Sequence, residues 1–222
     1  MAHKEMTIHR YYSRKAKYAG YAQADLELCI KHCGGDVVRI ELVNLHHRTE
    51  LRRQLRRLLL LVFLATAYFV GVCGFWSRNI GLWQPRIIYP LVTWALVAIL
   101  MLRSTLNLVH IERIFYSWDM ALQTETVRSF GRQSVLCIQR GHIHDIVLNE
   151  VIEDLDVKYM LILRTKGSLF KKRPVIPLFN SQSPSFECLQ HTHRVLHSYW
   201  LNSTKDRSEQ SYNQDKFSLV AS

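Results

Sequence analysis

Two long apolar blocks stand out in an otherwise mixed sequence. They cover residues 58–76 and 87–102, and neither contains Asp, Glu, Lys or Arg. A helix of about 20 apolar residues crosses the hydrocarbon core of a bilayer, and the first block is close to that length. The second has about 16 residues, which correspond to about 24 Å of helix. The pattern predicts a two-helix transmembrane hairpin with a connecting loop over residues 77–86; a buried hairpin in a soluble protein is the alternative.

After residue 103 the apolar positions form short runs separated by glycine and polar residues, as is typical of β-strands. Alternation is irregular in residues 142–149, which predicts a bulge or a strand buried on both faces. The predicted strands are residues 112–117, 121–128, 134–139, 142–149, 158–166 and 174–179.

A helix is predicted to follow the last strand. Ser183 is suited to cap it, Pro184 fits its first position, and apolar residues continue at helical spacing to Leu201. Strands followed by one helix are the order found in pleckstrin-homology-like barrels. The predicted fold class is therefore an α+β membrane protein, in which a transmembrane hairpin precedes a small antiparallel β domain over residues 103–201.

The two ends of the chain have weaker patterns. Residues 1–57 form an N-terminal region in which only residues 37–43 alternate like a strand, while residues 45–57 form a basic lead-in to the first helix. Its first residues are polar and basic, so no secretory signal is expected. Residues 202–222 have little to bury and are predicted to be a disordered tail.

Positive charge predicts the orientation in the membrane. The connecting loop carries only Arg78 and Arg86, whereas more arginines flank the outer ends of the blocks. By the positive-inside rule both termini then face the cytoplasm, where the Asn202 glycosylation sequon stays unmodified. The flanking residues are Arg48, Arg52, Arg53, Arg56 and Arg57 before the first block, and Arg103 and Arg113 after the second.

The net charge of +11 admits two interpretations. A nucleic-acid-binding protein would be expected to interleave basic and aromatic residues on a folded platform. Here much of the excess lies beside the apolar blocks, where each Lys or Arg contributes about 1 kcal/mol of attraction to an anionic leaflet. The pattern favours contact with a membrane, and no nucleic-acid partner is expected.

The sequence indicates no metal site and no cofactor. Its five cysteines are scattered, which favours free thiols over a disulfide framework. Cys29, His32 and Cys33 lack a second ligand pair at a regular spacing. His193 and His197 are four residues apart on the predicted helix, but no third ligand is identifiable.

A nucleotide-sugar transferase would need a phosphate cradle, such as a glycine-rich turn that leads into a helix. No such turn is visible, and the β domain is small for two substrates. The residues therefore predict that this chain alone does not transfer a nucleotide-linked sugar.

Several segments carry a resemblance to a known family. Residues 145–152 (Asp-Ile-Val-Leu-Asn-Glu-Val-Ile) resemble the signature of the H subunit family of phosphatidylinositol N-acetylglucosaminyltransferase. The hairpin lies where the family has it, and the resemblance covers most of residues 6–201. The other similar segments are residues 10–13 (Arg-Tyr-Tyr-Ser), Gly131, 137–139, 159–163, 175–179, Pro184 and 187–189.

The resemblance implies an accessory, non-catalytic subunit in the endoplasmic reticulum membrane. Its complex transfers N-acetylglucosamine from UDP-N-acetylglucosamine to phosphatidylinositol, the first step of glycosylphosphatidylinositol-anchor biosynthesis. The expected partners are a catalytic glycosyltransferase subunit and other membrane subunits. An independent lipid-binding membrane adaptor with a pleckstrin-like domain is the alternative.

Two sets of polar residues are candidate binding sites. Asp145, Asn149 and Glu150 are candidates for partner contact, although satisfaction at a surface or turn explains them as well; strand alternation puts the first two on one face and Glu150 on the other. A second set, Lys171, Lys172 and Arg173, forms a basic turn that either is solvated or contacts anionic phosphatidylinositol headgroups.

Overall fold

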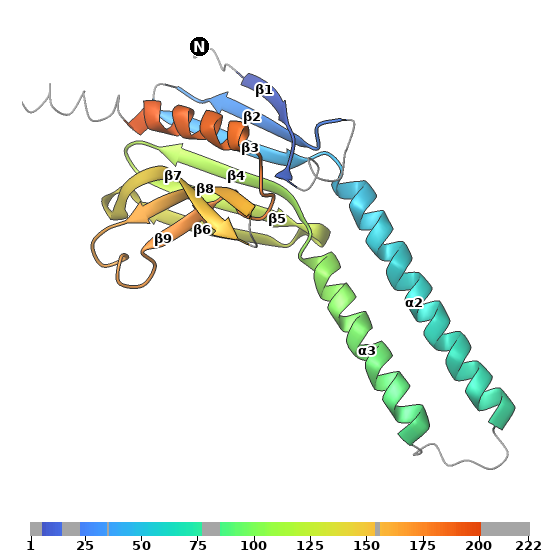
Figure 1. The fold of residues 1–222 in the computed structure, drawn as a ribbon. Coiled ribbons are helices and arrows are strands. Elements are labelled where there is room, and N and C mark those ends of the chain that lie inside the picture. Colours follow the sequence, from blue (N-terminus) through green and yellow to red (C-terminus); the bar gives the residue numbers. More distant parts are fainter. Residues whose placement is uncertain (1–5, 15–22, 35, 77–84, 154–155, 201–222) are drawn as a thin grey trace, which may run out of the picture. The chain divides into compact units, whose positions relative to one another are not determined.

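The computed structural model describes residues 6–14, 23–34, 36–76, 85–153 and 156–200, which form an α+β fold with antiparallel sheets and long apolar helices (Figure 1). The predicted tail and most of the predicted connecting loop lie outside these residues. The elements are β1 (Met6–Tyr11), β2 (Leu26–His32), β3 (Val37–Asn44), α2 (His47–Trp76), α3 (Pro85–Leu106), β4 (Val109–Ser117), β5 (Ala121–Arg128), β6 (Gln133–Gln139), β7 (Ile143–Glu153), β8 (Asp156–Thr165), β9 (Val175–Leu178), two short 3-10 turns and a C-terminal helix over residues 186–200.

The chain divides into two compact units. One, the β unit, contains Met1–Leu45, Ile111–Val127 and Gln133–Ser222. The other, the hairpin unit, contains His46–His110 and Arg128–Arg132.

Strands that precede and strands that follow the two long helices in the chain form one sheet, in the order β1-β2-β3-β4-β5-β6. In β2 and β3 alternate side chains are buried, and their register joins Leu28 to Leu42 and Ile30 to Ile40. The sequence pattern treats residues 1–57 and 103–201 as separate regions and assigns no fold to most of the first. In the structure β1, β2 and β3 belong to the same sheet as β4, β5 and β6, and β3 pairs with β4 of the second region, so the N-terminal region contributes directly to the core.

A second sheet contains β7, β8 and β9 in that order. The register of β7 against β8 shifts between Ile143 and Asp145, so His144 is an extra residue in β7. Because of this bulge, Ile143 and Ile146 are both buried although they are three residues apart. Of the two predicted alternatives for this strand, the bulge is confirmed.

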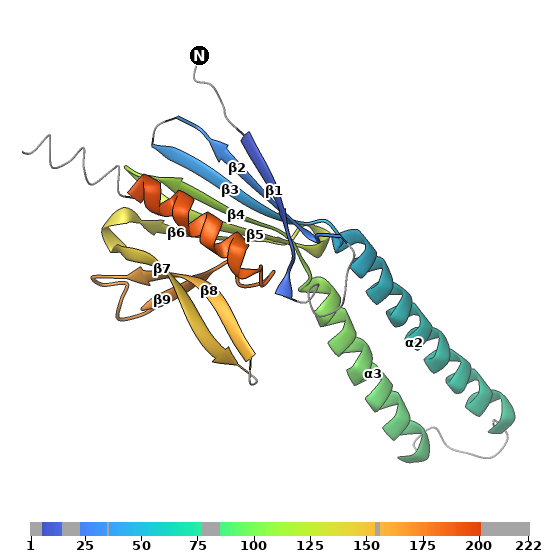
Figure 2. The same ribbon diagram turned by 45° about the horizontal axis from the view of Figure 1, so that its top comes forward.

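The C-terminal helix packs on the core with one face. Cys188, Leu189, Thr192 and Leu196 are buried, at the spacing expected for an amphipathic helix. The apolar ones join a cluster that draws side chains from both sheets. Figures 1 and 2 show this helix beside the sheets in both views.

The start of this helix differs from the prediction. Pro184 forms an antiparallel bridge with Ser13 and is not the first helical residue, and Ser183 has a positive φ of 45°. Arg14 N donates to the carbonyl of Ser183, and Ser185 N donates to that of Tyr12. This strand-like pairing with the N-terminal region delays the helix to residue 186.

Polar contacts also attach the C-terminal helix to the first strands. The Tyr11 hydroxyl lies 2.7 Å from Nδ1 of His191, and the Tyr199 hydroxyl lies 2.5 Å from Nδ1 of His32. Burial lowers the pKa of His191, and the nearby His9 and Arg194 lower it further.

The hairpin unit is built from α2 and α3. Helix α2 begins at His47, so the basic lead-in is already helical before the first apolar block. The imidazole centroids of His47 and His110 lie 4.5 Å apart, which brings the start of α2 close to the chain just after α3. The first residues of α2 and the last residues of α3 therefore lie at the same end of this unit.

We expect Leu28→Ala to lower the free energy of unfolding by about 2–5 kcal/mol, because it leaves a cavity in a fully buried site of β2. Ile8→Ala in the exposed strand β1 is the control and should change it by no more than about 0.5 kcal/mol. Urea unfolding of the detergent-solubilised chain measures both. Equal effects of the two substitutions would contradict a core that includes the N-terminal strands.

A pH dependence should follow from His191. Its pKa is lower in the folded than in the unfolded chain, so its contribution to stability is complete above the unfolded value of about 6.5. That contribution is lost as the pH falls through the lowered folded pKa. We expect His191→Gln to flatten the decline of the urea midpoint below pH 6.5, relative to the original chain. A decline of unchanged slope would show that another group is responsible.

Candidate functional site

Residues 145–152 lie on β7, the first strand of the second sheet. Asp145 faces Arg164 of β8 in the register, and Arg164 Nε donates a hydrogen bond of 2.6 Å to Asp145 Oδ1. A second contact joins Arg164 Nη2 to Asp145 Oδ2. The hydrogen bond to Arg164 holds the pKa of Asp145 below its ordinary value. Asp145 is thus an ionised member of a cross-strand ion pair, a role that the sequence alone does not reveal.

The other two candidates on β7 are exposed. Asn149 lies opposite Met160 and Glu150 opposite Tyr159, so the regular register puts their side chains on opposite faces. Asp145 shares a face with Asn149, as the alternation predicts. The three residues therefore do not converge on one point.

The basic triplet lies in the connection between β8 and β9. The amides of Lys172 and Arg173 donate to the carbonyl of Leu169 at 3.0 and 2.8 Å, which closes a tight turn. Lys171, Lys172 and Arg173 are all exposed. The turn is also fixed at its base, because Thr165 Oγ1 donates to the carbonyl of Arg173 at 2.6 Å.

Phe170 adds an aromatic ring to this basic turn. Its side chain is 56% exposed and directly precedes Lys171. An exposed ring beside several cations is a combination found in segments that contact membrane interfaces. The sequence-based prediction included the cations and omitted Phe170, although the isolated apolar residue between polar positions was a usable signal.

The two long helices expose their apolar side chains. By length and composition, His47–Gly71 and Tyr89–Leu106 are both sufficient to cross a membrane, with 0% and 6% of their most apolar windows buried. Thr66 and Thr93 donate their hydroxyls to carbonyls three residues earlier in the same helix, at 2.8 and 2.7 Å. These hydroxyls therefore leave no unsatisfied donor on an apolar surface.

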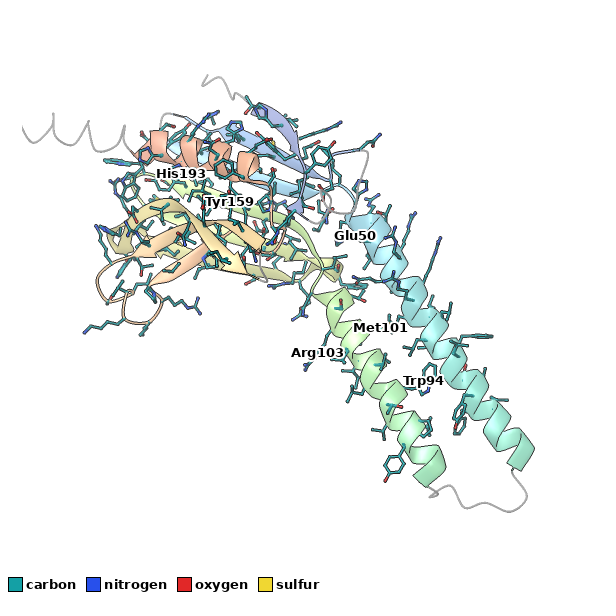
Figure 3. All side chains as sticks on the ribbon, viewed as in Figure 1. Glu50, Trp94, Met101, Arg103, Tyr159 and His193 are labelled. Atoms are coloured by element: carbon teal, nitrogen blue, oxygen red, sulfur yellow. The ribbon has the colours of Figure 1, made fainter. Side chains whose placement is uncertain are left out.

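Between α2 and α3 lies an apolar groove of about 500 Å³. Trp94 enters it from α3, as Figure 3 shows, opposite small residues that allow the helices to approach. Its lining residues are Leu61, Val62, Ala65, Thr66, Phe69 and Val70 of α2 and Leu91, Trp94, Ala95 and Ala98 of α3.

The start of α2 displays a cationic face. Arg52, Arg53, Arg56 and Arg57 are exposed and line a shallow groove with Thr49 and Leu60. Helical spacing puts these residues on the opposite face of α2 from the apolar groove. The cations are therefore presented away from α3.

The histidines that were candidate metal ligands make other contacts. His193 Nε2 lies 3.1 Å from the carbonyl of Ile146, and the His193 ring stacks on His197. His32 contacts the hydroxyl of Tyr199. In the parts of the chain that the structure describes, no group of three or more His, Cys, Asp or Glu residues is placed to hold a metal ion.

The described cysteines are unpaired. They are Cys29, Cys33, Cys137 and Cys188. Burial raises the pKa of the Cys188 thiol to about 12, which makes it a poor nucleophile at neutral pH.

Comparisons with family models, curated proteins and solved structures found no match to this chain.

The exposed basic turn makes the hypothesis of a headgroup contact testable. We expect replacement of Lys171, Lys172 and Arg173 by Ser to weaken cosedimentation of the chain with phosphatidylinositol vesicles when the protein is presented in nanodiscs, because three exposed charges each contribute about 1 kcal/mol near an anionic surface. The matched control replaces Arg10, Lys166 and Arg194, which are exposed and lie outside this turn. Equal cosedimentation of the triplet variant and the original chain would remove the headgroup hypothesis.

Proposed function

We propose that this chain is an accessory, non-catalytic membrane subunit of the complex that transfers N-acetylglucosamine from UDP-N-acetylglucosamine to phosphatidylinositol. Its role is to dock the catalytic glycosyltransferase subunit at the endoplasmic reticulum membrane. The observation that carries the proposal is a pair of exposed apolar helices inserted between two neighbouring strands of a folded β unit. The resemblance of residues 145–152 to the H subunit family supports the choice of complex.

Exposure of the helices supports a membrane anchor over a buried hairpin. The core helices of a soluble protein bury most of their apolar side chains. Here large apolar residues such as Leu59, Phe63 and Val70 are 66%, 69% and 67% exposed. Transfer of such surfaces from water to hydrocarbon is favourable by about 25 cal/mol per Å².

Chain connectivity supports one location for the β unit and for both outer helix ends. Only Leu45 and His46 separate β3 from α2, and only Asn107 and Leu108 separate α3 from β4. Since β3 and β4 are paired, a chain that crosses the bilayer with both helices would leave and return on the same side. The arginines before α2 favour the cytoplasmic side.

A docking role suits the described part of β7, where Asp145, Asn149 and Glu150 do not converge on one point. Attachment to a membrane-bound unit raises the effective concentration of a transferase toward a lipid acceptor. Asn149 and Glu150 offer exposed polar contacts on β7, and their strand belongs to the run that resembles the family. We propose this strand as the partner-binding surface.

The finer fold assignment is also a proposal. Antiparallel sheets with a C-terminal helix packed on their shared core support a pleckstrin-homology-like architecture for the β unit. Three strands before the hairpin and six after it would then form this architecture jointly, with the helices inserted between β3 and β4.

A second function, an independent lipid-binding adaptor, is favoured by one observation. Phe170 and the exposed triplet beside it form a turn suited to an anionic membrane surface. Affinity purification separates the two functions, because only the accessory subunit should copurify with a glycosyltransferase.

We expect the combined substitution Asn149→Lys and Glu150→Lys to reduce recovery of the glycosyltransferase several-fold in purification from mild detergent. Both side chains are exposed, so the substitutions should alter a contact surface without opening the core. Mass spectrometry of the bound proteins gives the measurement. Asp145 is left intact because its loss would also free Arg164.

Asp119→Lys is the matched control, since Asp119 is an exposed acid in the connection between β4 and β5. It should leave recovery unchanged. If the original chain itself brings down no glycosyltransferase, the proposed function is wrong; if the double variant binds as well as the control, β7 is not the docking strand.

A further inference from the structure

The turn between β5 and β6 is fastened to the end of α3. It consists of residues 128–132 (Arg-Ser-Phe-Gly-Arg), which belong to the hairpin unit. Ser129 is 2% exposed, and it donates to the Leu108 carbonyl both from its amide, at 2.8 Å, and from its hydroxyl, at 3.2 Å. Leu108 follows α3 by two residues. The position of the turn is therefore set by the helix and is not that of a free loop.

Phe130 occupies this turn in a conformation that its side chain disfavours. Its φ of 59° and ψ of 27° lie in the left-handed region, where Gly or Asn is preferred and a bulky aromatic residue is an outlier. The side chain is nevertheless 66% exposed, so burial does not explain the choice of an aromatic residue. A strained backbone that presents a ring to the exterior indicates a function outside the fold.

Two cations flank the ring. Arg128 N donates to the carbonyl of Arg132 at 2.8 Å, and this bond closes the turn with Phe130 between the two arginines. The turn thus presents one apolar ring together with two guanidinium groups, which are suited to bidentate contact with phosphate oxygens.

The helices indicate the depth of the turn. In the groove, Leu61 and Val62 of α2 share the lining with Ala98 of α3, so antiparallel helical spacing puts Arg57 and Arg103 at about one level. Both are the first charged residues beyond the apolar blocks, and Figure 3 shows Arg103 on the outer face of α3. Leu108 is then about 7.5 Å farther from the core along the helix axis. Because the headgroup region on each side of the core is about 5–8 Å thick, Leu108 and the turn bonded to it lie at headgroup depth.

We propose that residues 128–132 form a membrane-interface anchor, in which Phe130 enters the boundary between headgroups and acyl chains while Arg128 and Arg132 bind the phosphates of anionic phospholipids. Aromatic rings and arginines both favour this zone of the bilayer. The inference rests on the proposed membrane function and assigns to it a lipid contact separate from the Lys171–Arg173 turn. Its ligand is a phospholipid leaflet and not a protein.

Photocrosslinking of the full chain tests the anchor. The photoreactive analogue p-benzoylphenylalanine would replace Phe130, Phe63 or Phe115 in separate samples, reconstituted into phosphatidylcholine vesicles that contain phosphatidylserine. Phe63 of α2 is 69% exposed and reports insertion of the hairpin, while Phe115 of β4 is an exposed comparison in the β unit. We expect lipid adducts at positions 63 and 130, several-fold more abundant than at position 115.

The outcomes separate the anchor from the membrane proposal. Adducts at 63 without an excess at 130 over 115 would overturn the anchor and leave the hairpin inserted. In the complex purified from cells, an adduct at 130 to protein instead of lipid would also overturn it. Absence of lipid adducts at 63 would remove the membrane function and the anchor with it.

A second pair of variants tests the roles of the residues. Phe130→Gly should keep or raise the thermal midpoint, because glycine adopts the positive φ without strain; a lowered midpoint would assign the ring to folding and contradict the proposal. With the photoreactive residue at 130, Arg128→Gln together with Arg132→Gln should reduce the preference for phosphatidylserine over phosphatidylcholine adducts. An unchanged preference would overturn the phosphate contact.

Discussion

The pairing of β3 with β4 is the constraint on which the rest of the structure depends. These strands are neighbours in the sheet, from Val37 opposite Ser117 to Val43 opposite Ile111, yet both long helices lie between them in the chain. A flexible insertion would oppose the pairing by its closure entropy. Here α2 and α3 pack against each other and bring their outer ends together, so the inserted segment itself prepares the strands to pair.

Charge is distributed differently on the first sheet than on the helices and turns. On the sheet, Glu41 lies between cations, with Lys31 Nζ at 3.1 Å and Arg113 Nε at 3.1 Å, and Arg113 reaches Glu125 on β5 at 3.3 Å. Acidic and basic side chains therefore compensate one another across four strands. The chain has a net charge of +11. Cations without such acidic neighbours lie in the first turns of α2, in the β8–β9 connection and in the turn that holds Phe130. This pattern suits an anionic bilayer better than a continuous nucleic-acid groove.

Local sequence patterns were sufficient for the later strands and insufficient where tertiary contacts decide. Strands β4 to β9 were predictable within a few residues because glycines and polar turns separate their apolar runs. In β2 the buried Cys29 interrupts the alternation of Leu28 and Ile30, and β1 is exposed except at Tyr11, so neither strand has a clear period. Likewise, the ion pair of Asp145 depends on Arg164, a residue of another strand whose register no local pattern specifies.

The exposed aromatic residues show a second limit of such patterns. A single Phe in a polar turn is counted as a possible core residue, whereas Phe130 and Phe170 both lie on the surface beside cations. The segments that join the β-strands to the two long helices are short. Only two residues link β3 to α2 and two link α3 to β4, and two extended residues span at most about 7 Å. Under the proposed function, a transferase bound to that unit would work close to the bilayer, where a lipid acceptor resides.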